Sequence, residues 1–453
     1  MLTNTDASVP AGAPETALYA EGIVAGTDGP VLVPEGTSCR RIPGTNLLHS
    51  DGAWLDGALR PTPGVVASLR RKLQSADLPT GNGRYYDMAE TALLDVMALQ
   101  NPRGAIVAAA SPYWRFVWPR DNAFAVVALA LTGMHANMWA ALRYVYSMQE
   151  ADGQFEARYL PDGSGRVPDQ RGRQHDGLGL TLWATWVVIQ LSPQDQVDDQ
   201  LPRLRSGIIA GIRAAVQVAA EEDGLPRPGQ DYWELDHPEA SLGLAAPLLA
   251  GLLAGADLAR RVGEPALSDA AKAGATSLYR TIHPVYGRNG YQRFPSGGGF
   301  DASVAYLLPP FISAPNDSTE GSGIIDAWKR SLRALEQPNG GLRPGQEWPD
   351  PDTAWTPQTA LFALTAASLN QSQTAHFLLD WLDNHRTRMG SLPEKVTAMG
   401  EPAAVAPLGM VSGLVLTALA ILDGAKIPRL SPPSSGESEP VSNTRPDKEP
   451  KQR

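Results

Sequence analysis

The connections between the helical segments of this chain alternate between very short and very long, and this alternation limits the folds that it can adopt. From Tyr85 onward, twelve stretches carry apolar residues at helical spacing. Some are joined by three or four residues, as at 132–135, 262–264 and 369–371. The six long connections, of roughly 15 to 25 residues, are 100–119, 151–176, 222–240, 282–299, 336–355 and 388–407. Long loops without secondary structure in a compact domain are usually functional, so we expect function in these six.

A closed ring of six helix hairpins accounts for this alternation, because every long loop then emerges on the same face. Helices that are apolar nearly all round, such as 123–131 and 241–256, would line the inside of the ring, and amphipathic helices would cover it. The first helix, 85–99, would pair with the last, 408–423, and close the circle. The sequence therefore predicts an all-α chain whose residues 85–425 form an (α/α)6 barrel. The alternative is an open helical solenoid, for which these unequal segments show no clear repeat.

The two ends of the chain differ from the predicted barrel in composition. Residues 1–84 are rich in Gly, Pro and short Val or Leu runs, which predicts an N-terminal extension of short strands or irregular pieces packed on the barrel. Residues 426–453 contain few apolar side chains, and we expect them to form a disordered tail.

Composition and local patterns also argue against several kinds of partner. The net charge of −10 disfavours nucleic acid, which is itself an anion. The single cysteine, Cys39, forms no internal disulfide, which fits a reducing compartment. No signal peptide is visible, no stretch reaches the roughly 18 apolar residues of a membrane span, and the histidines lack metal-ligand spacing. We expect a cytoplasmic protein without metal or cofactor; its oligomeric state stays open.

Polar and aromatic side chains concentrate in the long loops, and on the predicted ring these loops share one face. The candidates are Trp118, Arg120 and Asp121 in the first loop, Gln174 and Asp176 in the second, Trp233 and Glu234 in the third, Arg343 and Trp355 in the fifth, and Glu394 in the sixth. Asp121, and likewise Gln174 and Asp176, could instead cap the helices that follow them. An isolated loop glutamate is usually only solvated.

A pocket of this composition suits a sugar, because aromatic rings stack on pyranose faces while charged and amide groups bind hydroxyls. Cleavage of a glycosidic bond needs one carboxylic acid and one carboxylate. We expect Glu234, between Trp233 and Leu235, to lie in an apolar setting that disfavours its ionised form. We expect Glu394, in a more polar loop, to stay ionised.

The chain resembles glycoside hydrolase family 15, which includes glucoamylases, glucodextranases, bacterial trehalases and isomaltose glucohydrolases. The resemblance runs from Tyr85 to Leu422. It is carried by "VWPRDNAFA" at 117–125, "RQHDGLGLTLWA" at 173–184, "DYWEL" at 231–235, "GGLRPG" to "AW" at 340–355, and "GSLPEKV" with "PLG" at 390–409. It implies an (α/α)6 barrel that releases glucose from the non-reducing end of an α-glucoside with inversion of the anomeric carbon.

The resemblance also implies a role for each candidate residue. Glu234 would be the general acid and Glu394 the general base. The remaining candidates would bind the sugar: Trp118, Arg120, Asp121, Gln174, Asp176, Trp233, Arg343 and Trp355. Isomaltose- or malto-oligosaccharides are the expected substrates, and trehalose is the runner-up, because the "LPEKV" stretch and the final "PLG" also resemble bacterial trehalases. A glycan-binding protein without catalysis and a helical-barrel phosphorylase are the remaining alternatives.

Overall fold

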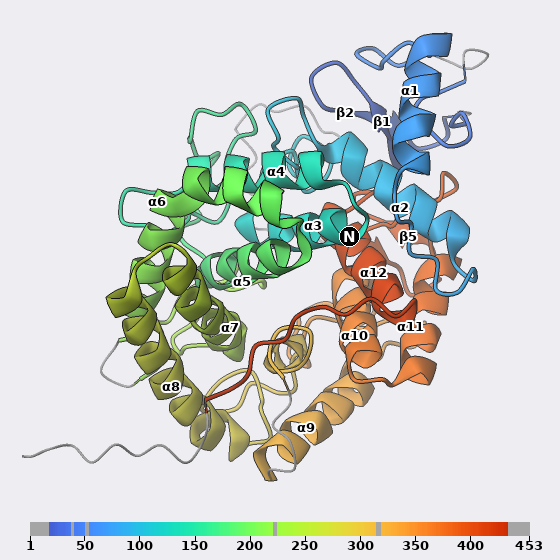
Figure 1. The fold of residues 1–453 in the computed structure, drawn as a ribbon. Coiled ribbons are helices and arrows are strands. Elements are labelled where there is room, and N and C mark those ends of the chain that lie inside the picture. Colours follow the sequence, from blue (N-terminus) through green and yellow to red (C-terminus); the bar gives the residue numbers. More distant parts are fainter. Residues whose placement is uncertain (1–17, 38–39, 50–53, 221–223, 314–318, 434–453) are drawn as a thin grey trace, which may run out of the picture.

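The computed structural model describes residues 18–37, 40–49, 54–220, 224–313 and 319–433, and its helices surround a common axis (Figure 1). The inner elements are α3 (Pro119–Leu131), α5 (His175–Leu191), α7 (Leu242–Arg261), the 3-10 helix η1 (Ala302–Leu307), α10 (Thr356–Ser368) and α12 (Gly409–Leu422). The outer helices are α2 (Tyr86–Leu99), α4 (His135–Ser147), α6 (Gln194–Val218), α8 (Pro265–Gly287), α9 (Thr319–Leu335) and α11 (Ser372–Asn384).

The inner elements form a closed ring. In chain order α3 packs on α5, α5 on α7, α7 on η1, η1 on α10 and α10 on α12, and α12 returns to α3. The outer helix α2 packs on α12, which is the predicted pairing of the first helix with the last. The (α/α)6 barrel is therefore confirmed, and the open solenoid is excluded.

The inner helices are buried on all sides, as their apolar sequences predict. Every residue of α3 from Pro119 to Ala130 is buried, and so is every residue of α10. The helices α5 and α7 cross at Gly179 and Gly251, where a Cβ on Gly179 would lie 2.2 Å from the carbonyl oxygen of Pro247. A residue with a side chain at this crossing would push the two backbones apart.

Helix α7 is the one helix of the described residues that is long and apolar enough to cross a membrane by length and composition alone. Of its most apolar stretch, 89% is buried inside the ring. The apolar surface of α7 therefore packs against neighbouring helices, as in the core of a large helical domain.

Residues 301–310 are one of the twelve stretches with helical spacing, but the helix that forms there is shorter than this spacing predicts. The stretch forms only the 3-10 helix η1, and the Asp301 side chain accepts a hydrogen bond from the Ser303 N–H at its start. Pro309 and Pro310 follow immediately. Because proline has no N–H to donate, the helix cannot continue through this pair.

The N-terminal segment packs against one side of the ring (Figure 1, blue). Strands β1 (Ala20–Ala25) and β2 (Pro30–Pro34) form an antiparallel hairpin, and β1 contacts α2. The pair Arg41–Asp95 connects the segment to α2, and Thr387 donates a hydrogen bond to the Glu21 carbonyl. The segment also contains helix α1 (Pro63–Gln74), which was not predicted, although its start is marked by the Thr62 cap and a proline in the first turn.

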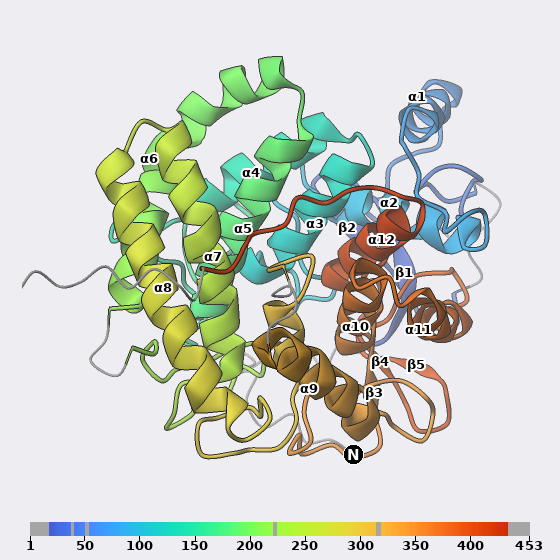
Figure 2. The ribbon, with the colours of Figure 1, turned by 60° about the horizontal axis from the view of Figure 1, so that its bottom comes forward.

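Residues 426–430, predicted to belong to a disordered tail, instead cross the end of the barrel opposite the long loops (Figure 2, red). Ile427 and Leu430 are buried, and the Ser313 N–H donates to the Leu430 carbonyl at 2.8 Å. The Arg429 guanidinium donates to the carbonyl of Ser368, the last residue of α10, at 2.9 Å. The predicted boundary at 426 is therefore too early. Residues 434–453 lie outside the described residues.

Candidate active site

The side chain of Arg120 joins three of the long loops. Its Nη1 donates to Gln174 Oε1 at 3.0 Å and to Asp176 Oδ2 at 3.3 Å, and its Nη2 donates to Glu234 Oε1 at 3.3 Å. Its Nε lies 3.3 Å from Asp121 Oδ2, without the alignment of a hydrogen bond. The structure thus brings together residues that the sequence places before α3, α5 and α7.

The start of α3 explains how Arg120 reaches the centre of this face. Trp118 is the extended residue before the helix, and Pro119 opens the first turn with the backbone angle that a helix needs. Asp121 lies inside the first turn, so it is not the N-cap. At the start of α5, one oxygen of Asp176 accepts the Gly177 N–H at 2.7 Å. Asp176 also lies inside the first turn, because the N-cap of α5 is Gln174, whose side chain makes no capping hydrogen bond. The capping interpretation is therefore wrong for these residues, and the other oxygen of Asp176 contacts Arg120.

Glu234 lies in a tight turn with an uncommon backbone conformation. Its φ of +58° is left-handed, and its N–H donates to the Asp231 carbonyl at 2.8 Å. For a residue other than glycine this conformation costs roughly 1–2 kcal/mol, and it persists only where the surroundings enforce it. The Trp118 indole donates to Glu234 Oε1 at 2.9 Å. The turn directs the carboxylate toward the first loop.

A buried ion network holds the Glu234 turn from behind. The Arg293 side chain is 1% exposed and pairs with Asp231 at 2.7 Å and with Asp301 at 3.1 Å. Its guanidinium carbon lies 3.8 Å from the centroid of the Trp233 ring, whose Nε1 donates to Asp301 Oδ2 at 3.1 Å. No residue of the fourth loop was predicted to belong to the site, yet Arg293 in that loop and Asp301, the N-cap of η1, hold the third loop in place. The one feature of the sequence that could have pointed to Arg293 is its position in a long loop.

The surroundings of Glu234 are more charged than the sequence indicates. Trp233 is buried against Arg293, and Leu235 is 37% exposed. The carboxylate itself contacts two cations, Arg120 and Arg171. The predicted apolar setting is wrong, because both guanidinium groups favour the ionised form of this carboxyl. Arg171, in the second loop, was also missed from the sequence.

Glu394 is buried, which corrects the expectation of a polar loop. Only 8% of the residue is exposed, and burial raises the pKa of its carboxyl above the usual range. The positive charge of Lys395 and a hydrogen bond from the Trp114 side chain partly oppose this shift. Burial disfavours the charged form, so these two neighbours supply the stabilisation of the carboxylate.

A small sheet, which the sequence analysis did not predict, fixes Glu394. Strand β3 (Ala354–Trp355) pairs with β4 (Lys395–Val396), and β4 pairs with β5 (Pro402–Ala403). This register sets Trp355 opposite Lys395, whose Nζ lies 4.1 Å from the Trp355 ring centroid. The Thr356 N–H donates to the Glu394 carbonyl at 3.1 Å. The fifth and sixth loops are thereby joined at the start of α10.

The Arg120–Asp121 pair connects the surroundings of the two glutamates. Arg120 contacts Glu234 directly, while the charge of Glu394 adds to the burial that raises the pKa of Asp121. Burial also raises the pKa of Asp176 to about 6, against the opposing charge of Arg120. Several acidic groups therefore contact one buried cation, Arg120. A cluster of carboxyl groups with shifted pKa values is typical of functional sites.

Six of the predicted site residues each have a buried polar atom without a protein hydrogen-bond partner. These atoms are Arg120 Nε, Asp121 Oδ2, Gln174 Nε2, Arg343 Nε, Trp355 Nε1 and Glu394 Oε2. Buried polar groups in proteins are almost always paired, so such atoms are suited to the hydroxyl groups of a ligand. Trp348 lies between Trp233 and Trp355, at ring distances of 4.9 and 5.0 Å, and connects the third loop to the fifth.

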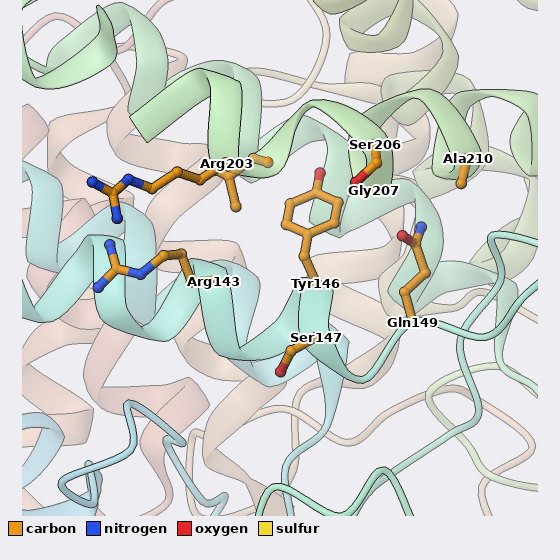
Figure 3. A pocket seen from close by; sticks show the side chains of 9 residues that line it. Arg143, Tyr146, Ser147, Gln149, Arg203, Ser206, Gly207 and Ala210 are labelled. Carbon is orange, nitrogen blue, oxygen red and sulfur yellow. The ribbon is translucent and has the colours of Figure 1, made fainter. Parts of the chain in front are cut away.

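A groove of about 460 Å³ lies apart from these residues, between the outer helices α4 and α6 (Figure 3). Its lining includes Arg143, Tyr146, Gln149 and Arg203 but none of the predicted site residues. Arg203 is paired with Asp199 at 3.1 Å. The groove is a gap between two outer helices, and the polar cluster of the six loops lies elsewhere. Within the described ranges, no group of three or more His, Cys, Asp or Glu side chains could hold a metal ion.

Comparison with known proteins agrees with this geometry. An uncharacterized glycosyl hydrolase of Methanocaldococcus jannaschii is 31% identical over 113 residues, which are 24% of this chain and 18% of that protein. A solved wild-type glycosidase has a TM-score of 0.63 at 19% identity over 74% of this chain and 96% of its own. A glucoamylase from Saccharomycopsis fibuligera has a TM-score of 0.60 at 12% identity, over 77% of this chain and 96% of its own.

A bacterial glucoamylase solved with acarbose has a TM-score of 0.59 at 14% identity, over 79% of this chain and 58% of its own. At such identities the structures show the fold alone. Residues 84–336 match the sequence model described as Glycosyl hydrolases family 15, and they make up more than half of the 453-residue chain. The chain therefore belongs to glycoside hydrolase family 15 and is a glycoside hydrolase of that family.

Proposed function

We propose that this protein is an inverting, exo-acting α-glucoside hydrolase that releases glucose from the non-reducing end of short α-glucosides. The main support is the arrangement around Arg120 and Asp121. Arg120 contacts Glu234, and the charge of Glu394 helps to raise the pKa of Asp121. Two carboxyl groups from different loops at one polar site are what hydrolysis of a glycosidic bond requires.

In this proposal the terminal glucose is held by the atoms that lack protein partners. Asp121 and Gln174 would bind hydroxyl groups together with Arg120, and Trp118 would pack against the ring. Arg343 and Trp355 approach from the fifth loop and would donate from Nε and Nε1. Such fixed donors and acceptors orient the sugar so that its anomeric carbon faces both glutamates.

The reaction then needs one proton donor and one proton acceptor. Glu234 gives its proton to the glycosidic oxygen as the bond between that oxygen and the anomeric carbon breaks. A water molecule attacks the opposite face of the carbon and loses a proton to Glu394, so charge and atoms balance. The two carboxyl groups should stand roughly 6.5–9.5 Å apart when the sugar is bound, which leaves room for the water.

Short isomaltose- or malto-oligosaccharides are the proposed substrates, supported by the glucoamylases among the solved structures of the same fold. A cytoplasmic location, proposed from the sequence, would favour short soluble sugars over granular starch. Trehalose is the alternative substrate within the family.

The test is a substrate panel of maltose, isomaltose and trehalose, in which the first glucose released is followed by proton NMR. We expect β-glucose to appear before mutarotation, from maltose or isomaltose. Initial α-glucose in excess of the α-anomer already present at the reducing end of the disaccharide would contradict inversion, and a requirement for inorganic phosphate would identify a phosphorylase. Activity on trehalose alone would establish the alternative substrate.

Lys395 should set the acidic limb of the pH profile. Its charge lowers the pKa of Glu394, which burial raises. Replacing Lys395 with methionine should therefore raise that pKa further, so that the base becomes protonated at higher pH. We expect the acidic limb of kcat/KM to move upward while the basic limb stays in place. Lys395→Arg, which keeps the charge, is the matched control, and an unchanged acidic limb in Lys395→Met would contradict this role.

A further inference from the structure

The two oxygens of the Glu234 carboxylate have different partners. Oε1 accepts the Trp118 indole N–H at 2.9 Å and an Arg120 N–H at 3.3 Å. Oε2 is paired with Nη1 of Arg171, which belongs to the loop between α4 and α5. Arg120 and Trp118 come from the first loop, so the two oxygens are held by different loops.

This difference determines which oxygen can deliver a proton. A carboxyl oxygen has about two lone-pair directions, and on Oε1 both are used by donors of the proposed glucose-binding group. The proton must then lie on Oε2. The departing glycosidic oxygen has to come within hydrogen-bond reach of that atom. Arg171 now occupies this position, and a guanidinium group cannot accept a hydrogen bond or share the site with the leaving group.

We propose that Arg171 is a displaceable counter-ion of Glu234, removed by the sugar unit on the leaving-group side as the substrate binds. This inference rests on the proposed role of Glu234 as general acid. Before binding, Arg171 keeps the carboxylate ionised. Once it is displaced, Glu234 takes up a proton and can transfer it. Arg171 is thus a positioning residue that couples occupancy of the leaving-group position to protonation of the acid.

The two cations at Glu234 have different ionic partners and different exposure. The Arg120 side chain is 9% exposed and contacts Gln174, Asp176 and Asp121, so it cannot leave without opening that network. Arg171 is 15% exposed, and its Nε lies 3.9 Å from the Asp169 carboxylate. Asp169 therefore offers a second ionic partner toward which the displaced guanidinium can turn.

Asp169 is itself held in place. It pairs with Arg158, whose guanidinium carbon lies 5.0 Å from the Trp118 ring centroid. The acceptor for the displaced Arg171 is thus fixed to the first loop, next to the Trp118 indole that contacts Glu234.

Other charged and titratable groups surround Glu234, and most are engaged in buried networks. Those that face it or stand directly behind its partners are Arg120 and Asp121 of α3, Asp176 of α5, Asp231 of its own loop, Arg293 and Asp301 of the fourth loop, and Tyr306 of η1. Removing the Arg171 charge changes the field at Glu234 without breaking the networks of Arg120 or Arg293.

The test compares the pH dependence of kcat/KM, which reports the free enzyme, with that of kcat, which reports the complex. A general acid must be protonated, so activity falls as pH rises through its pKa. A neighbouring cation lowers that pKa. In the natural protein we therefore expect the basic limb of kcat/KM on maltose or isomaltose to lie below that of kcat.

In Arg171→Gln the basic limb of kcat/KM should move up by about one pH unit toward that of kcat, which stays in place. Arg171→Lys should keep most of the separation. Arg166→Gln is the matched control, because Arg166 lies in the same loop, is 70% exposed and pairs with Asp162. It should change neither limb. Thermal unfolding of each variant verifies the fold.

Three results would overturn the inference: coincident basic limbs in the natural protein, equal shifts of both limbs in Arg171→Gln, or complete loss of activity in folded Arg171→Gln. The proposed function fails separately. If Glu234→Gln still hydrolyses the disaccharide, Glu234 is not the acid. If that variant loses disaccharide hydrolysis but the Arg171→Gln limbs do not move, only the inference about Arg171 fails.

Discussion

Replacing Glu234 with glutamine is expected to lower kcat on maltose or isomaltose by about 100- to 10,000-fold, the usual contribution of a general acid. Glutamine keeps the shape of the side chain and an oxygen for the Trp118 N–H, but it has no acidic proton. The hydrolysis rate of a substrate whose leaving group needs no proton should be unchanged in this variant. The informative comparison is therefore hydrolysis of the disaccharide against hydrolysis of α-glucosyl fluoride.

We expect Glu234→Gln to cleave the fluoride at close to the normal rate while disaccharide cleavage is nearly lost. Asp236→Asn is a matched control, since it makes the same acid-to-amide change two residues away on an exposed side chain. A parallel loss on both substrates would mean that Glu234 binds the sugar rather than protonating the leaving group. Normal turnover of the disaccharide would remove it from the mechanism.

The second large effect is expected at Glu394. Glu394→Gln should lower kcat by a similar factor on both the disaccharide and the fluoride, because water must be activated in either case. The two variants can therefore be told apart: Glu234→Gln should lose only disaccharide hydrolysis, and Glu394→Gln should lose hydrolysis of both substrates. Glu401→Gln, an exposed glutamate of the same loop, should leave turnover unchanged.

A small nucleophile provides a direct check of the role of Glu394. Because this side chain is buried, Glu394→Ala opens space where the attacking water is expected. Azide needs no base, so it should restore cleavage of α-glucosyl fluoride and form β-glucosyl azide, which NMR identifies. Formation of the α-azide, or no rescue in a correctly folded variant, would contradict attack by a base-activated water at that position.

Much of the fold could be predicted from helical periodicity and loop lengths, because a closed ring is the packing that buries helices apolar on all sides. The periodicity failed where local chemistry stopped a helix, as at Pro309 and Pro310, which limit the inner element to η1. It also failed for the sheet of β3, β4 and β5. Two-residue strands leave no recognisable pattern, and only their pairing across loops creates them.

For the candidate site, the sequence indicated which side chains meet but not their electrostatic setting. Glu234 follows a tryptophan, yet its carboxylate contacts Arg120 and Arg171, which are distant in sequence. Glu394 lies in a loop of polar appearance and is buried because β4 pairs with β3. Arg293 was missed for the same reason, since its partners come from other loops. The protonation of these two carboxyl groups depends on neighbours that are distant in the sequence, so it cannot be predicted from the residues beside them.

Closure of the ring by α12 also determines the stage of synthesis at which the candidate site can be complete. The helix that seals the circle contacts α2 and α3, the first two helices of the barrel in chain order, and it is itself the last helix among the described residues. A nascent chain that already contains Arg120 and Glu234 still lacks the loop of Glu394, and α2 and α3 have no ring-closing partner until α12 has emerged. The candidate site can therefore be completed only in one step, when α12 closes the ring, rather than gradually as its loops are synthesised.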